Sequence, residues 1–307
     1  MSRIHEALKR AEQERASAQG PVSEPLAPEQ LGEQEAMPQL TGGPSITAGM
    51  PSFANSYTID SLLARCEKRA WTPDLKTMLF FNADEQAYGT EEFRTLRSRI
   101  YQMREKQNLK KLLITSSLPK EGKSFVAANL AQALVRQHGR RVLLIDADLR
   151  GARLHQALGT SVTPGVSEYL SGETDELSII QRGPMENLFF APAGRLVSNP
   201  GELVANGRLK FLLNRMEPIF DWIIVDSPPA IPISDASLLA NYCDGVLMVV
   251  RSSATPFDIA RKARQEFRDT QLIGVVLNGI VAGSSPYTQY YYEAYGTGNG
   301  KPAAALR

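Results

Sequence analysis

The sequence predicts an α/β fold with a doubly wound, mostly parallel sheet, preceded by a disordered N-terminal linker and followed by a mobile C-terminal tail. Short runs rich in Leu and β-branched residues alternate with helix-length amphipathic stretches, the rhythm of a parallel sheet covered by helices. Six such runs are expected to be strands: residues 112–115, 142–145, 188–190, 223–225, 246–250 and 273–277. A chain of 307 residues that is 43% hydrophobic can bury one core of about 200 to 250 residues.

The N-terminal 56 residues divide into two predicted segments. Residues 1–17 carry apolar side chains at helical spacing among Arg, Lys and Glu, so we expect a short amphipathic helix. This helix is either a solvated tail or a docking helix for a partner. Residues 18–56 are rich in Pro, Gly, Ser, Gln and Glu, which cannot bury enough surface to fold, and we expect a flexible linker.

One folded domain is expected over residues 57–283. It begins with a short helix from Ile59 and reaches a longer helix that starts near Thr90. Glu91 and Glu92 in the first turn of this longer helix suit the positive end of the helix dipole.

The charge and cysteine content exclude several classes of function. The 34 Lys and Arg residues nearly balance 33 Asp and Glu, and the net charge of +1 gives no global field that would attract nucleic acid. Cys66 and Cys243 are far apart, with no second Cys or His at ligand spacing, so neither a disulfide framework nor a zinc or iron–sulfur site is predicted. No run approaches the ~18 apolar residues of a membrane span, and no secretion signal is evident. We therefore expect a cytoplasmic protein that reaches the inner face of the membrane only through a partner.

The strongest motif joins the strand at residues 112–115 to a helix over residues 125–137 through a Gly-Lys-Ser loop. Loop amides and the helix N-terminus form a nest for phosphates, Lys123 reaches the β- and γ-oxygens of ATP, and the Ser124 hydroxyl can ligate Mg²⁺. Ser117 replaces the first Gly of the G-x-x-x-x-G-K-[ST] pattern. The alternative is a chance Gly-Lys-Ser at a helix start. The predicted nucleotide-contacting residues of this segment are Ser117, Pro119, Lys120, Glu121, Gly122, Lys123, Ser124 and Phe125.

Carboxylates follow two further predicted strands. Asp146 and Asp148 are expected on one face of a strand because side chains alternate with period two, and Asp226 ends another strand. With Lys123, they form the predicted catalytic set at the carboxyl edge of the sheet. We assign Ser124, Asp146 and Asp226 to the Mg²⁺ shell and Asp148 to proton acceptance, although Asp146 and Asp148 could exchange roles. The alternative is an ordinary Asp-rich loop.

Half of the ten tyrosines lie within nine residues of the predicted tail, residues 284–307. They are surrounded by polar residues and Gly, so they are accessible phosphate acceptors or else a sticky aromatic segment that packs on a partner. The five are Tyr287, Tyr290, Tyr291, Tyr292 and Tyr295.

Over roughly residues 75–295, these motifs resemble the bacterial tyrosine kinases (BY-kinases) of polysaccharide production. The matching segments are Thr-Ser-x-x-Pro-x-Glu-Gly-Lys-Ser at residues 115–124, Asp-Ala-Asp-Leu-Arg at residues 146–150, Asp-Ser-Pro-Pro at residues 226–229, and Glu-x-x-Arg-x-x-Arg at Glu91, Arg94 and Arg97. Lys120 departs from the Gly usual in this loop, and Ala152 departs from the Pro usual after the second motif.

The resemblance implies an ATP- and Mg²⁺-dependent autokinase that phosphorylates its own tail tyrosines in trans and regulates capsular or exopolysaccharide synthesis or export. It implies a ring-like homo-oligomer through Glu91, Arg94 and Arg97, a membrane-anchored polysaccharide chain-length regulator as activator, and a tyrosine phosphatase. Asn278 resembles the residue that contacts the adenine base in related ATPases, although a strand-end Asn is often only a turn residue.

Two other functions compete with this hypothesis. A partitioning or positioning P-loop ATPase would share the strand-end carboxylates, but its signature Lys is replaced here by Leu118 and it gives the tyrosine tail no role. A nucleotide-binding scaffold would use the tail for docking.

Overall fold

The structure is a computed structural model. It describes residues 57–81, 89–137, 139–231, 233–267 and 270–280. The chain divides into two units, Met1–Pro51 and Ser52–Arg307, and every described residue belongs to the second. The predicted helix over residues 1–17, the linker over residues 18–56 and the tail over residues 284–307, with its five tyrosines, lie outside the described residues. Their boundaries stay predictions.

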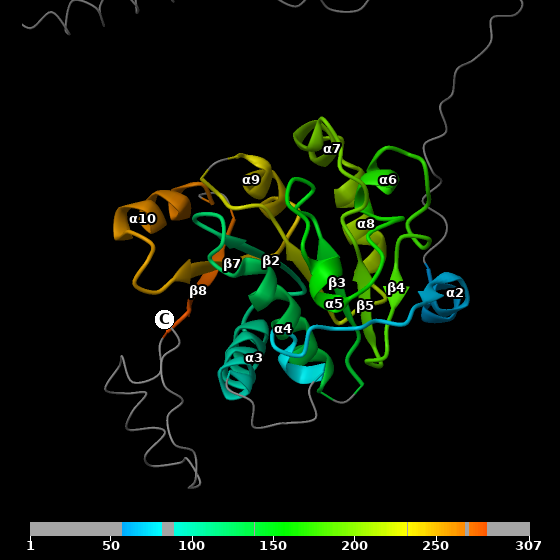
Figure 1. Ribbon diagram of the computed structural model, residues 1–307, viewed down its shortest axis with the longest axis horizontal. Coiled ribbons are helices and arrows are strands. Elements are labelled where there is room, and N and C mark those ends of the chain that lie inside the picture. Colours follow the sequence, from blue (N-terminus) through cyan, green and yellow to red (C-terminus); the bar gives the residue numbers. More distant parts are fainter. Residues whose placement is uncertain (1–56, 82–88, 138, 232, 268–269, 281–307) are drawn as a thin grey trace, which may run out of the picture. The chain divides into compact units, whose positions relative to one another are not determined.

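An eight-stranded sheet forms the centre of the described domain, in the order β1-β4-β5-β3-β6-β2-β7-β8 (Figure 1). Its strands are β1 (Glu67–Lys68), β2 (Lys111–Ser116), β3 (Val142–Asp146), β4 (Gln181–Arg182), β5 (Leu188–Ala191), β6 (Trp222–Asp226), β7 (Gly245–Arg251) and β8 (Leu272–Asn278). Neighbours are parallel except β4 and β5, which are antiparallel. The predicted mostly parallel sheet is confirmed, and all six predicted runs are strands. The two-residue strands β1 and β4 were not predicted.

Helices cover both faces of this sheet (Figure 1). One face packs against α3 (Thr90–Arg104), α4 (Lys123–Val135), α5 (Leu154–Leu158) and the 3-10 turn η1 (Leu79–Phe81). The other packs against α2 (Ile59–Arg65), α6 (Val166–Leu170), α7 (Pro200–Ala205), α8 (Arg208–Met216), α9 (Asp235–Ala240) and α10 (Phe257–Gln265). Strand side chains alternate between the two cores, so that Leu112 and Leu113 belong to different ones. None of the described helices is long and apolar enough to cross a lipid bilayer.

Helix α4 lies directly under the centre of the sheet, and residues 126–135 are all buried. Its two polar side chains in that stretch hold a neighbouring segment. The Asn129 Oδ1 accepts the Leu79 N–H at 2.9 Å, and its Nδ2 donates to the Thr77 carbonyl at 2.8 Å. Gln132 Oε1 accepts the Phe80 N–H at 3.2 Å. Buried backbone groups ahead of α3 are thus paired by side chains of α4.

The strand order brings three carboxyl ends together at one edge. β2 lies between β6 and β7, and β6 lies between β2 and β3. Asp146 at the end of β3 is in register with Asp226 at the end of β6, and Ile114 of β2 is in register with Asp226 on its other side. Because these strands are parallel, the loops that follow them leave the same edge of the sheet.

Asn129→Ala should lower the free energy of unfolding by about 1–3 kcal/mol, because it leaves the buried Leu79 N–H and the partly buried Thr77 carbonyl without the side chain that pairs them. Urea denaturation followed by circular dichroism measures the change. Gln102→Ala, on the exposed side of α3, is the control and should alter stability by less than about 0.5 kcal/mol. Equal effects of the two substitutions would contradict the anchoring role of Asn129.

Candidate active site

The loop between β2 and α4 has the form of a P-loop. Gly122 precedes the helix with φ 97°, and a Cβ at this position would lie 2.0 Å from Asn278 Nδ2, so only glycine fits. The same Asn278 amide donates to the Glu121 carbonyl at 2.8 Å. The end of β8 therefore lies against the P-loop. The predicted contact of Asn278 with the adenine base stays a prediction.

Lys123 is the positive centre of the site. Its Nζ lies 2.8 Å from Asp148 Oδ2, 3.7 Å from Asp226 Oδ2 and 3.3 Å from Ser124 Oγ. Ser124 in turn donates to Asp226 Oδ2 at 2.5 Å. The structure thus brings together the predicted lysine, hydroxyl and carboxylates from three separate strand–loop units.

Asp148 reaches this cluster in a different way from the one predicted. β3 ends at Asp146, so Asp148 lies in the following loop and the alternation of strand side chains does not place it. Instead, the Asp148 N–H donates to Asp146 Oδ1 at 3.2 Å, and Gly151 N–H donates to Asp148 Oδ1 at 2.9 Å. A turn stabilised by carboxylates therefore directs Asp148 toward Lys123.

Crowding of buried carboxylates perturbs their ionisation. Burial, with the charge of Asp226 beside it, raises the pKa of Asp146 from 3.8 to about 8. Burial also raises the pKa of Asp226, to about 6, against the opposing effect of Lys123. Burial alone would lower the pKa of Lys123, but Asp226 and Asp148 outweigh it and raise that pKa. The ammonium of Lys123 is therefore held charged among groups that resist ionisation.

The donor set fits Mg²⁺ bound in the manner of P-loop proteins. Asp226 Oδ1 is buried and has no hydrogen-bond partner among the described residues, so it can accept a cation or a water bound to one. Ser124 Oγ lies beside it. Within the described ranges, no cluster of three or more His, Cys, Asp or Glu is arranged as a metal site. In P-loop sites, Mg²⁺ is usually bound by one or two protein side chains together with substrate phosphates and water.

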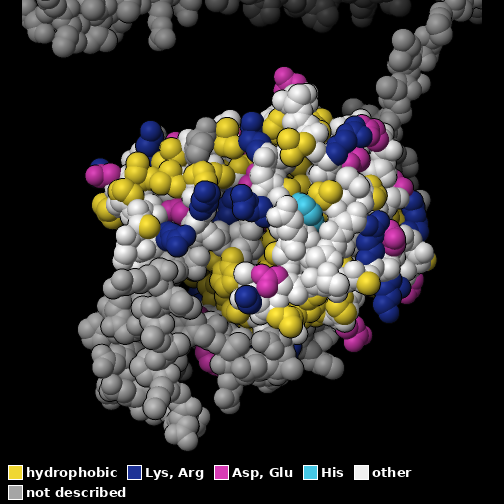
Figure 2. All heavy atoms as spheres, viewed as in Figure 1, with side chains coloured by type: hydrophobic (Ala, Val, Ile, Leu, Met, Phe, Trp, Pro, Cys, Tyr) yellow, Lys and Arg dark blue, Asp and Glu magenta, His cyan; other side chains and the backbone are white. Residues whose placement is uncertain are grey.

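The other predicted loop residues occupy varied positions. Ser117 is buried, and its hydroxyl has no partner among the described groups. Pro119 and Lys120 are exposed, and the Phe125 ring packs on Phe93 at 5.7 Å between centroids, which gives it a structural contact. In Figure 2, a group of Lys and Arg side chains lies near the centre of the view, beside the apolar surface over α10.

Two residues outside the predicted set brace the site. Arg150 pairs with the buried Asp235 at the start of α9, at 2.8 Å, which fixes the loop after β3. Thr255, in the turn between β7 and α10, donates to the Glu121 carboxylate. Neither Asp235 nor Thr255 belongs to a local motif, so the sequence offered no signal for them.

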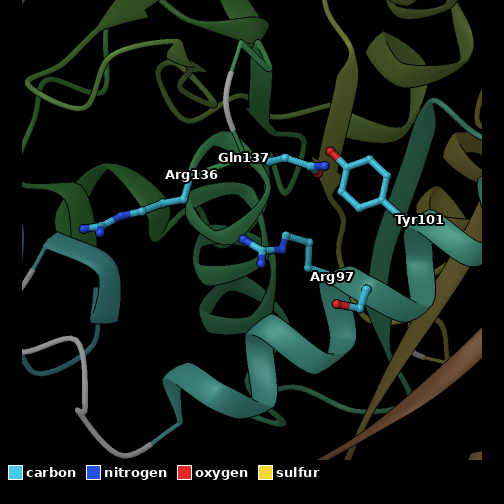
Figure 3. A pocket seen from close by; sticks show the side chains of 5 residues that line it. Arg97, Tyr101, Arg136 and Gln137 are labelled. Atoms are coloured by element: carbon cyan, nitrogen blue, oxygen red, sulfur yellow. The ribbon is translucent and has the colours of Figure 1, made fainter.

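A hollow of about 350 Å³ between α3 and the end of α4 is not this site (Figure 3). Arg97, Tyr101, Arg136 and Gln137 line it. Lys123 begins α4, whereas Gln137 lies just beyond its end at Val135, so the two are roughly 20 Å apart at 1.5 Å per helical residue. The strand-end carboxylates and the P-loop define the chemical site instead, because there a lysine, a hydroxyl and buried carboxylates converge at the carboxyl edge of the sheet.

The predicted oligomerisation residues lie on α3. Glu91 and Arg94 form an ion pair with each other, and Arg97 donates to the Ala133 carbonyl of α4 at 2.9 Å. Both contacts are internal to the chain. A role for these three residues at a subunit contact stays a prediction.

A mostly parallel sheet with a P-loop after β2 and carboxylates at the ends of β6 and β3, the next two strands in the sheet, defines a P-loop NTPase. The model of the ParA family, described as the NUBPL iron-transfer P-loop NTPase, matches residues 109–306. Tyrosine-protein kinase YwqD of Bacillus subtilis (strain 168) is 33% identical over 216 residues, covering 70% of this chain and 89% of that protein. Tyrosine-protein kinase wzc of Salmonella typhimurium is 32% identical over 208 residues, covering 67% of this chain but only 29% of that protein.

Among solved structures, the kinase domain of Escherichia coli tyrosine kinase ETK superposes with a TM-score of 0.64 at 30% identity, covering 67% of this chain and 82% of that one. The chain belongs to the ParA group of P-loop NTPases and, within it, to the bacterial tyrosine-protein kinases.

The raised pKa of Asp146 predicts a pH-dependent stability. Between about pH 4 and 8 the folded chain retains a proton that the unfolded chain has released, so this group makes folding less favourable as the pH rises. Asp146→Asn removes the effect. Without nucleotide or Mg²⁺, its melting temperature relative to wild type should increase by at least about 2 °C from pH 5 to pH 8.

Asp221→Asn is the matched contrast for that experiment. Burial alone would raise the pKa of Asp221, but hydrogen bonds from the Arg141 N–H and the Arg140 side chain lower it below its usual value. This carboxylate therefore stabilises the fold at neutral pH, and its replacement should lower the melting temperature there. If the melting temperatures of wild type and Asp146→Asn changed with pH in parallel, the raised pKa of Asp146 would be contradicted.

Proposed function

We propose that this chain is a Mg-ATP-dependent protein tyrosine kinase that phosphorylates the tyrosine cluster of its own C-terminal segment in trans. The observation that supports it most is the convergence of Lys123, Ser124, Asp148 and Asp226 at the carboxyl edge of β2, β3 and β6. Membership of the bacterial tyrosine-protein kinases supports the class of acceptor.

In this mechanism, the P-loop amides and Lys123 hold the β- and γ-phosphates, with Lys123 exchanging its contact to Asp148 for phosphate oxygens. Bound Mg²⁺, held by Ser124 and Asp226 with Asp146 behind them, would neutralise phosphate charge. Asp148 accepts the phenolic proton as the tyrosine oxygen bonds to the γ-phosphorus and ADP leaves. Because its pKa is raised to about 8, Asp146 retains its own proton at neutral pH, and both its oxygens already accept backbone N–H groups. Asp148 is therefore the better placed proton acceptor.

Tyrosines in the folded body are poor acceptors. Tyr169 is buried, and burial raises its pKa to about 12. Tyr57 donates to Glu176, and Tyr101 accepts from Trp222 Nε1 at 3.1 Å. The proposed acceptors are instead the tail residues Tyr287, Tyr290, Tyr291, Tyr292 and Tyr295.

The family suggests the biological setting. We propose a role in regulating capsular or exopolysaccharide synthesis or export, with a membrane-anchored chain-length regulator as activator and a tyrosine phosphatase as antagonist. The chain would work in the cytoplasm, at the inner face of the membrane through that activator.

A partitioning-type ATPase is the second candidate, favoured by the match to the ParA family. Leu118 stands where such ATPases carry their signature Lys, which argues against it. The iron-transfer description of the matching family finds no counterpart here, because the chain has only Cys66 and Cys243, separated by most of the domain.

Lys123→Met should reduce autophosphorylation at least about 100-fold, because it removes the cation that faces the transferred phosphate. A variant with all five tail tyrosines changed to Phe should also fail to label, yet still bind Mg-ADP. Anti-phosphotyrosine blotting and mass spectrometry of the C-terminal peptide measure tyrosine labelling, and calorimetry measures the binding of Mg-ADP. Thermal melts show whether each variant is folded.

Labelling of Lys123→Met at the wild-type rate would exclude this site. Phosphate found only on Tyr57, Tyr88, Tyr101, Tyr169 or Tyr242 would exclude the tail as acceptor. ATP hydrolysis without any phosphotyrosine would favour the partitioning-type ATPase.

Trans phosphorylation predicts an assembly in which one subunit's tail enters the next subunit's site. Changing Glu91, Arg94 and Arg97 together to Ala should convert a large, salt-sensitive oligomer into monomer, as should autophosphorylation, because crowded phosphates of about −1.5 to −2 charge repel one another. Light scattering measures the mass. Changing Arg99, Glu105 and Lys106 to Ala alters the net charge equally and should leave the oligomer intact. An unchanged oligomer in the first variant would refute this contact.

A further inference from the structure

Glu121 occupies an unexpected place for an acidic side chain. It directly precedes Gly122 and Lys123 in the P-loop, and it is only 3% exposed. A buried carboxylate beside a phosphate-binding loop repels the phosphates, so its presence there requires a compensating role.

The contacts of Glu121 indicate that role. Its Oε2 accepts the Leu118 N–H at 2.7 Å, which closes the loop across its own width. Its Oε1 accepts the Thr255 hydroxyl, and its carbonyl accepts Asn278 Nδ2 at 2.8 Å. One residue thus joins the beginning of the P-loop to the ends of β7 and β8.

Arg251 at the end of β7 and the turn that follows it, residues 252–256, complete this brace. Thr255 Oγ1 accepts the Arg251 N–H at 3.3 Å while it donates to Glu121, so its orientation is fixed at both ends. The Arg251 guanidinium donates to the Lys120 carbonyl at 3.2 Å. Arg251 and Thr255 therefore hold the loop at two consecutive residues, Lys120 and Glu121.

The brace acts where the loop backbone is strained. Lys120 has φ 67°, in the left-handed region that side chains other than glycine rarely occupy. A strained residue keeps such a conformation only when its surroundings fix it. The contacts of Arg251 and Glu121 on either side supply that constraint.

We propose that Glu121 is a positioning residue for ATP: with Thr255 it locks the P-loop to the β7–α10 turn in the conformation that receives the phosphates. The role is one of hydrogen-bonded geometry, so it requires the shape of the side chain and not its charge. The proposal rests on the proposed Mg-ATP site.

Four substitutions in the full chain separate geometry from charge. Thr255→Val removes the hydroxyl at constant shape and Thr255→Ser restores it, while Glu121→Ala removes the carboxylate and Glu121→Gln retains an acceptor for Leu118 and a donor for Thr255. The measurements are amide hydrogen exchange of Leu118, calorimetric affinity for Mg-ADP, and the ATP dependence of autophosphorylation. Thr95→Val, at an exposed position of α3, is the control.

Thr255→Val and Glu121→Ala should accelerate exchange of the Leu118 amide and raise both the Kd for Mg-ADP and the KM for ATP about 10-fold or more, with kcat within about threefold of wild type. Glu121→Gln and Thr255→Ser should remain within about threefold of wild type in all three. If Glu121→Ala does not fold, the comparison of Thr255→Val with Thr255→Ser and Glu121→Gln still tests the proposal.

Unchanged exchange and affinity in Thr255→Val would overturn the proposal. A rise in the Kd for Mg-ADP and in the KM for ATP in Glu121→Gln as large as that in Glu121→Ala would also overturn it, because the carboxylate would then act by charge. A wild-type chain that binds Mg-ADP but labels no tyrosine would contradict the proposed kinase function alone, since exchange and ADP affinity test the brace independently.

Discussion

The site depends on one buried electrostatic arrangement, in which Lys123 lies between carboxylates that cannot all ionise without it. Asp146 and Asp226 are fully buried, and the strand register sets them side by side. In such surroundings the ammonium is held by charge as well as by geometry, which is why its pKa rises despite burial. The same arrangement destabilises the fold at neutral pH, an expected consequence where charged groups gather for chemistry rather than for packing.

The parallel pairing of the strands and the position of α4 bring these charged groups together. Parallel pairing places the ends of β3, β6 and β2 at one edge, and α4 begins at that edge with Lys123 and Ser124 in its first turn. The buried stretch of α4, residues 126–135, fixes the position of the loop, because its apolar residues occupy one core of the sheet. Asn129 and Gln132 then pair the backbone that passes beneath it. The packing of α4 in the core therefore also determines the position of the phosphate-binding loop.

The sequence was sufficient to predict the features that depend on a repeating pattern of apolar residues or on a short local motif. Six strands were found because each is a run of apolar residues of the right length, whereas β1 and β4 contain two polar or charged residues each and carry no pattern. The P-loop directly follows β2 and Asp226 is the last residue of β6, so the sequence could predict that they converge at one edge of the sheet. Asp148 does lie beside Lys123, but the predicted alternation of strand side chains does not place it there, since it lies beyond the end of β3. The link from Thr255 to Glu121 spans 134 residues and depends on side-chain geometry that no local pattern encodes.

The two departures of the loop from its common patterns have different physical weight. Ser117 stands where the general motif has Gly, but its backbone is not among the left-handed ones, so no glycine is required there. Lys120 stands where the family has Gly and does adopt φ 67°, so this departure costs conformational energy. Gly122 cannot depart at all, because both its φ and the approach of Asn278 exclude a Cβ. Where a glycine is needed for conformation alone, contacts from outside the loop can compensate for its loss, and where it is needed for space they cannot.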